Sequence, residues 1–486
     1  MDAEPTGWET AWTGGRRCVH VGNVADFNAQ FLAPELLDRP LPGAGPVARP
    51  GGGPADRLRA AALRRFGPPA TARRPGPALD WPREGHHYAG LAPFYSPHPA
   101  AVVLPQHLDR AWLDLLTTRL EWDQVGLFSG IAEDDWLWPA LLARPHLLAE
   151  LRGLGLPLVA WGRSPGDGGD TRVHAAVRRF ESKRVSLQLF AEVARAGHPE
   201  IRVRQQLRPD GPRALARALA RRAAAGQTSV LKAEYGVGGL GTVVLTPDQI
   251  IMAGGALSAL GRAMDQDPLI REHGMLLEPY VEGADRLRDV TFDAVVATDG
   301  RVHPVGAGVM HLVGTGYQGA TIGPGLLPRQ LAVRATGFGV DVGKALAAAG
   351  YRGWFDVDFV LDRQHRLAPM EANLRLTGPS VGFMIKARLD RVRGPGHLVR
   401  TLDHLPLGAR LSEQTLFDHL TGLARRCAEH DVLLLPTMPG TAFEPHPTVG
   451  VALVARSLPA LDTAEALVRA GNSALGRLFG GLSQPS

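Results

Sequence analysis

The first third of the chain alternates short apolar runs with longer segments of helical character. The expected strands are 18–27 (a strand followed by a turn), 100–105, 125–130 and 156–162, and the expected helices are 107–123 and 133–155. Strands that alternate with helices are typical of βαβ units, whose strands are parallel. This region is therefore predicted to be a Rossmann-like α/β domain.

A different alternation occupies residues 353–378, GWFDVDFVLDRQHRLAPMEANLRLTG. It predicts two strands joined by a short polar turn at 363–366, with acids at positions where strands normally carry apolar or neutral residues. Because side chains alternate between the two faces of a strand, Asp356 and Asp358 share one face and apolar residues occupy the other. The acids of the first strand are thus gathered on a single face of the hairpin.

The second strand of this hairpin presents Glu371, Asn373 and Arg375 on one face. With the turn at 363–366, Asp358 lies directly across from Glu371. Two carboxylates in that position repel each other and destabilise the strand pair. A hard divalent cation bound between them makes the arrangement favourable. Mg²⁺ favours a few oxygen ligands plus the phosphates of a nucleotide. A hairpin with a solvated acidic face is the alternative, which the apolar opposite face and the matched Asn and Arg disfavour.

The segment 228–245, TSVLKAEYGVGGLGTVVL, supplies a candidate phosphate site in which Lys232 ends an apolar strand. The glycines that follow are Gly236, Gly238, Gly239 and Gly241. Glycines let the backbone approach phosphate oxygens and offer N–H groups to them. Their spacing matches the dinucleotide fingerprint, but that fingerprint needs a following helix, and TVVL continues as a strand. We predict a flap that closes over phosphates; a glycine-rich hairpin with no ligand is the open alternative.

Between these two segments, residues 275–302 contain an apolar strand that runs into Glu278-Pro279-Tyr280-Val281. A second strand begins near Asp289. Proline cannot donate a hydrogen bond, so it indicates a strand edge or a connecting segment. The exposed backbone groups of such a segment can pair with the edge of an adenine ring.

Residues 180–385, approximately, resemble the ATP-grasp superfamily. The resemblance lies in five features in this order: Lys183, the Lys232 glycine hairpin, the segment 278–281, the strand from Asp289 and the acidic hairpin. The layout of the whole chain is similar to actinobacterial pheganomycin-type peptide ligases. The resemblance implies an α/β (α+β) chain in which a Rossmann-like pre-ATP-grasp domain precedes the ATP-grasp fold and a small αββα domain follows it. The expected domains are 1–175, with a Pro/Gly-rich loop near 40–80, then 176–390 and 391–486.

The resemblance also implies roles for individual residues. Nucleotide contacts are expected from Lys183, Lys232, Gly236, Gly238, Gly239, Gly241, Glu278, Tyr280, Val281 and Asp289; metal ligation is expected from Asp358, Glu371 and Asn373, and catalytic roles from Arg375 and Lys232. In that family the two lysines contact the α/β phosphates, the hinge grips adenine largely by its backbone, and an acid holds the ribose. Asp289 fits the last role better than Asp285. Asn373-Leu374-Arg375 lacks the proline of the family's usual N-P-R, and extra residues separate the hinge from Asp289.

The activity that the resemblance implies is ATP- and Mg²⁺-dependent ligation of a carboxylate to an amine through an acyl phosphate, with release of ADP and phosphate. Amino acids, peptides and small carboxylates are all compatible as substrates. An ATP-grasp enzyme of another reaction type, such as a carboxylase, and a nucleotide-binding protein without turnover remain alternatives. A third is a partner-binding protein whose C-terminal segment carries the function.

Composition narrows these classes only slightly. The net charge is +5, and the arginines are dispersed along the chain. The sequence has no basic block and no zinc-ligand spacing, which disfavours nucleic-acid binding. The two cysteines, Cys18 and Cys427, form no CxxC motif. The first ten residues do not resemble a signal peptide, and no apolar run has the length of a membrane span, so a cytoplasmic protein is expected. The C-terminal αββα segment is the expected interface if the chain forms a homodimer.

Overall fold

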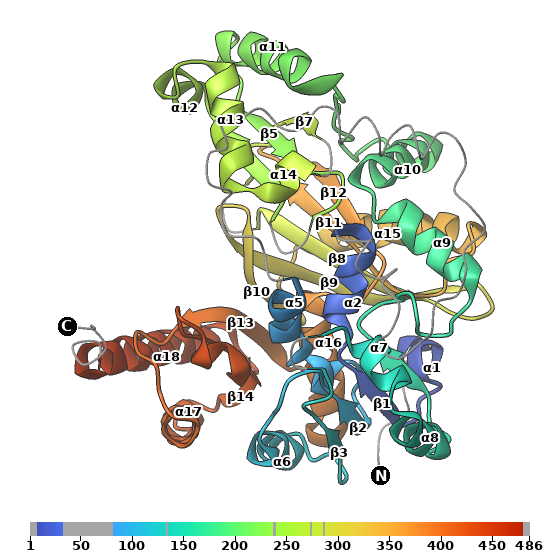
Figure 1. The fold of residues 1–486 in the computed structure, drawn as a ribbon, viewed down its shortest axis with the longest axis vertical. Coiled ribbons are helices and arrows are strands. Elements are labelled where there is room, and N and C mark those ends of the chain that lie inside the picture. The colour runs from blue at the N-terminus through green and yellow to red at the C-terminus, as the bar shows by residue number, and fades with distance from the viewer. Residues whose placement is uncertain are drawn as a thin grey trace, which may run out of the picture.

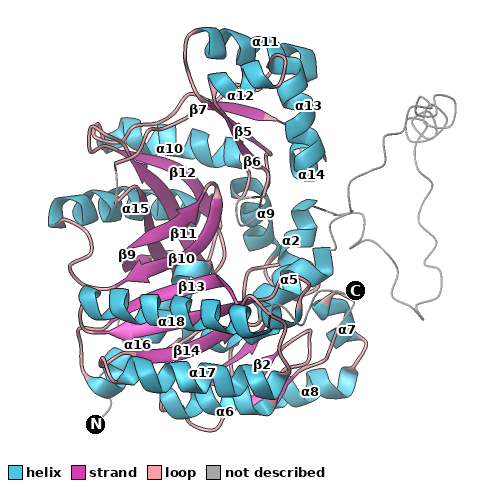
Figure 2. Cartoon of the chain, turned by 90° about the vertical axis from the view of Figure 1, so that its left-hand side faces the viewer, coloured by secondary structure: helices cyan, strands magenta, loops and turns pink. Residues whose placement is uncertain are grey.

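A computed structural model describes residues 7–32, 81–132, 135–236, 240–272, 275–284 and 287–479. The loop expected near 40–80 lies outside the described residues. The described elements form three sheets with helices packed on them (Figures 1 and 2). The predicted α/β class is confirmed.

The N-terminal sheet has four parallel strands in the order β3-β2-β1-β4. Its elements are α1 (Gly7–Thr13), β1 (Cys18–Val21), α2 (Val24–Leu32), α5 (Trp81–Ala89), η1 (Ala92–Phe94), β2 (Pro99–Val103), α6 (Arg110–Arg119), β3 (Gly126–Phe128), α7 (Leu137–Leu142), α8 (Pro145–Gly153) and β4 (Leu158–Ala160). The two central strands, β1 and β2, are largely buried, as expected when helices cover a parallel sheet, whereas the edge strands β3 and β4 are more exposed. The predicted Rossmann-like arrangement is present.

A small antiparallel sheet of order β6-β5-β7 follows. It comprises β5 (Ser229–Lys232), β6 (Thr242–Leu245) and β7 (Leu276–Pro279), with α11 (Gly211–Ala224), α12 (Pro247–Met252), α13 (Ala256–Gln266) and α14 (Pro268–Glu272) around it. The two helices that precede it in the chain, α9 (Thr171–Phe180) and α10 (Lys183–Gly197), belong instead to the core of the largest sheet. Lys232 pairs with Thr242, so the glycine segment connects two antiparallel strands and is not followed by a helix. This is the hairpin that the sequence predicted.

The largest sheet has eight strands in the order β12-β11-β8-β9-β10-β13-β15-β14. Its first five strands in chain order, with two helices, are β8 (Asp289–Val296), β9 (Val302–Val313), β10 (Gly316–Ile322), α15 (Arg329–Ala348), β11 (Gly353–Leu361), β12 (Leu367–Asn373) and α16 (Gly378–Arg393). Helix α15 lies very close to the sheet at Gly339, where an added Cβ would stand 2.1 Å from the ring of Phe292. The acidic hairpin, β11 with β12, is therefore the edge of a well-packed sheet.

The C-terminal elements are β13 (Leu398–Pro406), α17 (Glu413–Ala428), β14 (Leu433–Met438), η2 (Pro439–Phe443), β15 (Thr448–Ala455) and α18 (Leu458–Phe479). The predicted helix–strand–strand–helix order is present in α17, β14, β15 and α18. However, these strands continue the eight-stranded sheet through β13, a strand that the pattern did not predict. The C-terminal segment thus shares a sheet with the acidic hairpin (Figure 2).

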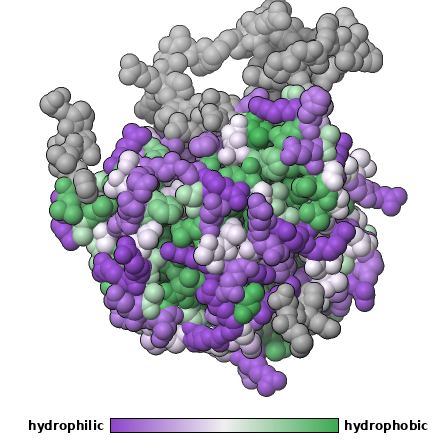
Figure 3. Space-filling view, turned by 90° about the horizontal axis from the view of Figure 1, so that it is seen from below, coloured by the Kyte–Doolittle hydropathy of each residue, from purple (hydrophilic) through white to green (hydrophobic). Residues whose placement is uncertain are grey.

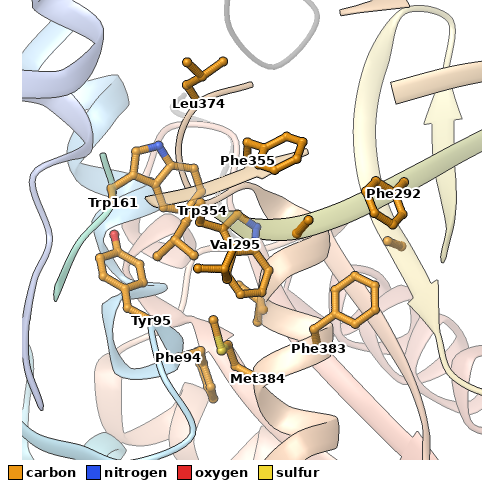
Figure 4. Close-up of a cluster of buried hydrophobic side chains, with 14 of the residues drawn as sticks. Phe94, Tyr95, Trp161, Phe292, Val295, Trp354, Phe355, Leu374, Phe383 and Met384 are labelled. Carbon is orange, nitrogen blue, oxygen red and sulfur yellow. The ribbon is translucent and has the colours of Figure 1, made fainter. Parts of the chain in front are cut away.

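One hydrophobic core joins the N-terminal sheet to the large sheet. Figure 4 shows Tyr95 and Trp161 from the N-terminal part close to Trp354 of β11, with Met384 of α16 below them. Trp8 of α1 also packs edge-on against Trp354, with ring centroids 5.7 Å apart. Burial of this aromatic surface fixes the N-terminal sheet against the strands that carry the acids.

On the face of the molecule in Figure 3, hydrophilic and hydrophobic residues are interspersed. Within the described part of the chain, no helix has both the length and the apolar character needed to cross a membrane.

Candidate active site

The acidic hairpin has the register that the sequence predicted. Asp358 pairs with Glu371 and Asp356 pairs with Asn373 across the β11–β12 ladder, and the turn lies between Leu361 and Leu367. Asp362 stabilises this turn, because its carboxylate accepts hydrogen bonds from the backbone N–H groups of residues 364 and 366. The two facing carboxylates are therefore a consequence of strand alternation and a tight polar turn.

The polar face of the hairpin is tightly coupled. Asn373 Nδ2 donates to Asp356 Oδ1 at 2.8 Å and to Asp358 Oδ2 at 3.3 Å. The other carboxylate oxygens, Asp356 Oδ2 and Asp358 Oδ1, are buried and have no hydrogen-bond partner among the described residues. Across the next strand pair, Asp356 also lies opposite the buried Asp293 of β8. Three carboxyl groups and one amide thus gather where β8, β11 and β12 run side by side.

The pKa values of these carboxyl groups follow from their surroundings. Burial raises the pKa of Asp356 to about 7, and burial together with Asp356 and Glu371 raises the pKa of Asp358 well above its usual value. For Glu371, desolvation works against the charge, but Lys183 and Lys232 outweigh it and hold its pKa at about 2. The cluster thus contains one firmly ionised carboxylate beside two whose charged form is disfavoured by burial.

Lys183 reaches this cluster from a different element. It is the first residue of α10, which Ser182 caps by accepting a hydrogen bond from the backbone N–H of Val185. Its Nζ lies 2.8 Å from Glu371 Oε2, and its backbone N–H donates to the carbonyl of Glu234 beside the glycine hairpin. The helix start therefore joins the acidic hairpin to the glycine hairpin.

Lys232 belongs to a second ionic group that the sequence did not reveal. Its Nζ lies 3.3 Å from Glu278 Oε2, an oxygen that also accepts from Arg204 Nη1 at 2.5 Å. Gln206 Nε2 donates to the other oxygen of Glu278 at 2.7 Å. Desolvation lowers the pKa values of Lys232 and Arg204, and Glu278 opposes it in both. The side chain of Glu278 thus holds two buried cations in place, in addition to any backbone role.

Two further residues predicted to contact the nucleotide, Tyr280 and Asp289, lie near Arg288 and line the same cavity as Lys232 and Glu278. Asp289 accepts from Arg288 Nη1 at 2.7 Å and 3.0 Å, and the Arg288 guanidinium stands 5.7 Å from the ring centre of Tyr280. The alternative acid, Asp285, lies outside the described residues. Asp289 is therefore already paired with an arginine that a ribose hydroxyl would have to share or displace.

Only part of the glycine hairpin is described, since Gly238 and Gly239 lie outside the described residues. An added Cβ at Gly236 would stand 2.5 Å from the carbonyl oxygen of Leu240 and 3.5 Å from Lys183 Nζ. Gly241 has φ +77°, a left-handed conformation that favours glycine, and its N–H donates to Asp267. Both glycines are thus required by close approach or by backbone geometry.

Most of these groups face one cavity of about 510 Å³. Of the predicted residues it is lined by Lys183, Lys232, Gly236, Glu278, Tyr280, Val281, Asp289, Asp358, Glu371, Asn373 and Arg375; Gly241 is described but is not among the lining residues. Apolar side chains such as Val230, Val360 and Met370 complete the end near Val281. The cavity therefore combines cationic and acidic side chains with an apolar cluster formed by Val281, Val360 and Met370.

Arg375 lies where the N-terminal sheet meets the hairpin. Its guanidinium stands 5.5 Å from the ring centre of Phe27, and its Nη1 is buried without a hydrogen-bond partner among the described residues. The adjacent backbone is fixed, because Leu376 N–H donates to the carbonyl of Trp161 and Leu374 N–H donates to the half-buried carboxylate of Glu181. Arg375 is thus a held cation with donor capacity left for an anionic ligand.

The residues present fit a magnesium ion. Asp358 and Asp356 each have a buried oxygen without a hydrogen-bond partner, and Glu371 and the amide of Asn373 add further oxygens of the type that Mg²⁺ prefers. Among the described residues, no group of three or more His, Cys, Asp and Glu has the geometry of a preformed metal site. Mg²⁺ commonly binds through one or two carboxylates together with phosphates. The hairpin can supply the carboxylates of such a site.

No protein-family model and no curated protein matches the sequence. Solved structures with a similar arrangement include carboxyaminoimidazole ribonucleotide synthase from Aspergillus clavatus with ATP (13% identity, 79% of this chain and 99% of that chain, TM-score 0.46). Another is biotin carboxylase from Campylobacter jejuni (14% identity, 75% of this chain and 84% of that chain, TM-score 0.47). A third is the biotin carboxylase domain of 2-oxoglutarate carboxylase from Hydrogenobacter thermophilus (11% identity, 76% of this chain and 84% of that chain, TM-score 0.48). At such identities the assignment of a function depends on the residues of this chain.

Proposed function

We propose that this chain is an ATP-grasp ligase that uses ATP and Mg²⁺ to join a carboxylate to an amine, with release of ADP and phosphate. The observation that carries the proposal is the convergence of Lys183 on Glu371, directly across the ladder from Asp358. Cations and carboxylates from separate elements meet in one cavity, as a site for phosphates and a metal requires.

The charges of the site suit phosphoryl transfer. That reaction depends on positioning and on neutralising charge, more than on covalent participation of the protein. Lys183 and Lys232 come from two sides of the cavity and would hold phosphate oxygens, as the resemblance to ATP-grasp proteins implies. Asp358, Glu371 and Asn373 would hold Mg²⁺, which when bound neutralises charge on the phosphates.

Arg375 would orient the carboxylate that attacks the γ-phosphate. Its unpartnered Nη1 can donate to that carboxylate and then to the acyl phosphate that forms. The cavity is lined both by Arg375 and by the residues that we propose to contact the nucleotide. Amino acids and peptides are the substrates that we propose, because the layout is similar to pheganomycin-type peptide ligases.

The experiment that tests this function supplies Mg²⁺-ATP with amino acids and short peptides, offered singly and in pairs. ADP release is measured, and mass spectrometry identifies condensed products. ADP and an amide that appear only with particular acid–amine pairs would support the proposal. Absence of ATP binding by equilibrium dialysis would refute it.

A further inference from the structure

The cavity is also lined by side chains that no proposed nucleotide or cation contact uses. They are Val24, Asn28, Tyr88, Trp161, Tyr317 and His404. Asn28 lies on the helix after β1, and Trp161 directly follows β4, so both come from the carboxyl-end edge of the parallel sheet. Open α/β sheets bind their ligands at this edge. A second reactant therefore has a place in the same cavity.

His404 enters the cavity because of a bulge in β13. Pairing with β15 passes from Leu402 opposite Val451 to Leu405 opposite Val449, so that Asp403 and His404 together face a single residue. A β-bulge re-aims side chains, and such bulges are frequent next to active sites. His404 lines the cavity, whereas Asp403 is only 2% exposed.

Tyr88 meets His404 from the N-terminal domain. Its Oη lies 3.0 Å from His404 Nε2, and the two rings are edge to face with centroids 5.9 Å apart. Helix α5 holds Tyr88 in position because Gly85 packs on Ala25, where an added Cβ would stand 2.5 Å from the Ala25 Cα. A phenol and an imidazole from distant parts of the sequence therefore form one hydrogen-bonded pair at the cavity wall.

Burial and one neighbouring imidazole favour the neutral form of His404. Burial and then His87 of α5 lower the pKa of His404, and His87 itself lies 3.6 Å from Glu444. On its own strand, burial raises the pKa of Asp403 to about 7. At neutral pH the imidazole can therefore accept a proton.

Tyr317 of β10 lines the cavity together with this pair and with residues of the acidic hairpin. Its ring packs directly on Gly378, where an added Cβ would stand 2.3 Å from a ring carbon. Tyr317 lines the same cavity as Tyr88, His404 and Asp358, and burial raises the pKa of its phenol. The imidazole pair and the proposed metal ligands thus belong to one site.

We propose that the Tyr88–His404 pair receives the proton that the amine loses during amide formation, an inference that rests on the proposed ligase function. The lone pair of the amine nitrogen forms the new C–N bond, while the bond from the acyl carbon to the phosphate oxygen breaks. Phosphate leaves with that electron pair. The proton of the nitrogen passes to Tyr88 Oη as the hydroxyl proton passes to His404 Nε2, and the imidazolium then releases its proton to water.

The test compares two nucleophiles on the full chain with Mg²⁺-ATP and an acid that supports ADP release. One is the amine partner found with that acid. The other is hydroxylamine, which is unprotonated at neutral pH and converts an acyl phosphate to a hydroxamate without needing a protein base. His404→Gln and Tyr88→Phe should each slow amide formation by about 100-fold, the usual contribution of a general base. Both should still form hydroxamate.

His311→Gln is the matched control. His311 lies on β9, bonds Thr321 at 2.7 Å and also has its pKa lowered by burial, but it is not among the residues that line the cavity. It should change neither product. The part of the acid limb of the pH–rate profile that is due to the imidazole should also be lost in His404→Gln, which leaves the limb due to protonation of the substrate amine.

Two results would overturn the inference while leaving the ligase function intact. One is equal loss of amide and hydroxamate in His404→Gln, and the other is unchanged amide formation in both variants. If the wild-type chain forms neither ADP nor hydroxamate with any acid, the ligase function fails and the inference fails with it.

Discussion

Lys183 Nζ lies 2.8 Å from Glu371 Oε2, and this ion pair joins the first turn of α10 to the edge strand of the eight-stranded sheet. Lys183 is almost fully buried, whereas about a third of the Glu371 side chain is exposed. A buried ammonium needs a compensating charge, which Glu371 supplies. The pair therefore brings a fixed positive charge to the cavity beside a carboxylate that remains ionised.

The first prediction concerns the proposed phosphate contacts. Lys183→Met should reduce ADP release by about 100-fold or more, because loss of one preorganised charge at a transition state typically costs that much. Lys344→Met is the control, since Lys344 is 67% exposed and pairs with Asp341 on the surface of α15. Steady-state ADP release with Mg²⁺-ATP provides the measurement. Equal activity of the two variants would remove Lys183 from the site.

The second prediction concerns the acidic hairpin, where one change should have opposite effects on activity and stability. Asp358→Asn removes a carboxylate whose charge Asp356 and Glu371 oppose. In the presence of EDTA the free energy of unfolding of the variant should therefore exceed that of the wild type by about 1 kcal/mol. This is roughly the free energy that corresponds to a pKa shift of one unit. The Mg²⁺ concentration for half-maximal ADP release should rise at least about 10-fold.

Thermal unfolding in EDTA and a Mg²⁺ titration of ADP release measure these two effects. Asp299→Asn, at an exposed turn between β8 and β9, is the control for loss of a carboxylate. An Asp358→Asn variant with an unchanged Mg²⁺ requirement would show that Asp358 is not a metal ligand.

The third prediction concerns Glu278, which accepts from both Arg204 and Lys232. Glu278→Gln leaves two buried cations without a carboxylate and should lower the free energy of unfolding by about 3–5 kcal/mol. Glu282→Gln lies a few residues away, where the side chain is 63% exposed and pairs with an exposed arginine. That control should change stability by less than about 0.5 kcal/mol. Urea unfolding distinguishes the two, and similar values would contradict a structural role for the buried group.

The fourth prediction uses two glycines of α15. Gly339→Ala should destabilise the chain by about 1–3 kcal/mol, because its Cβ would stand 2.1 Å from the ring of the buried Phe292. Gly337→Ala should stabilise it by about 0.5–1 kcal/mol, since the nearest atom to its Cβ is 3.8 Å away and alanine has the higher helix propensity. Opposite signs in urea unfolding are expected. The same sign for both would mean that α15 is not seated on the sheet as described.

The sequence predicted the features that depend on local periodicity. The pairing of Asp358 with Glu371 followed from the two-residue period of strands and the position of the turn, and it is present in the structure. Likewise, Lys232 and Thr242 pair as expected for a glycine hairpin between strands.

Features that depend on contacts between distant segments were not predictable in the same way. Arg204 and Gln206 meet Glu278 across more than 70 residues, and no local pattern marks them as partners. Strand β13 was missed, and with it the bulge that directs His404 toward Tyr88, 316 positions away in the sequence. Such meetings depend on how the sheets pack against each other, which periodicity within one segment does not encode.

The central claim, activation of a carboxylate by the γ-phosphate of ATP, is tested most directly by oxygen transfer. An acid that supports ADP release would be labelled with ¹⁸O in its carboxylate, and the phosphate product would be analysed by mass spectrometry. If the carboxylate attacks the γ-phosphate, one labelled oxygen should appear in the inorganic phosphate while ADP is formed. Unlabelled phosphate, or formation of AMP in place of ADP, would contradict the account.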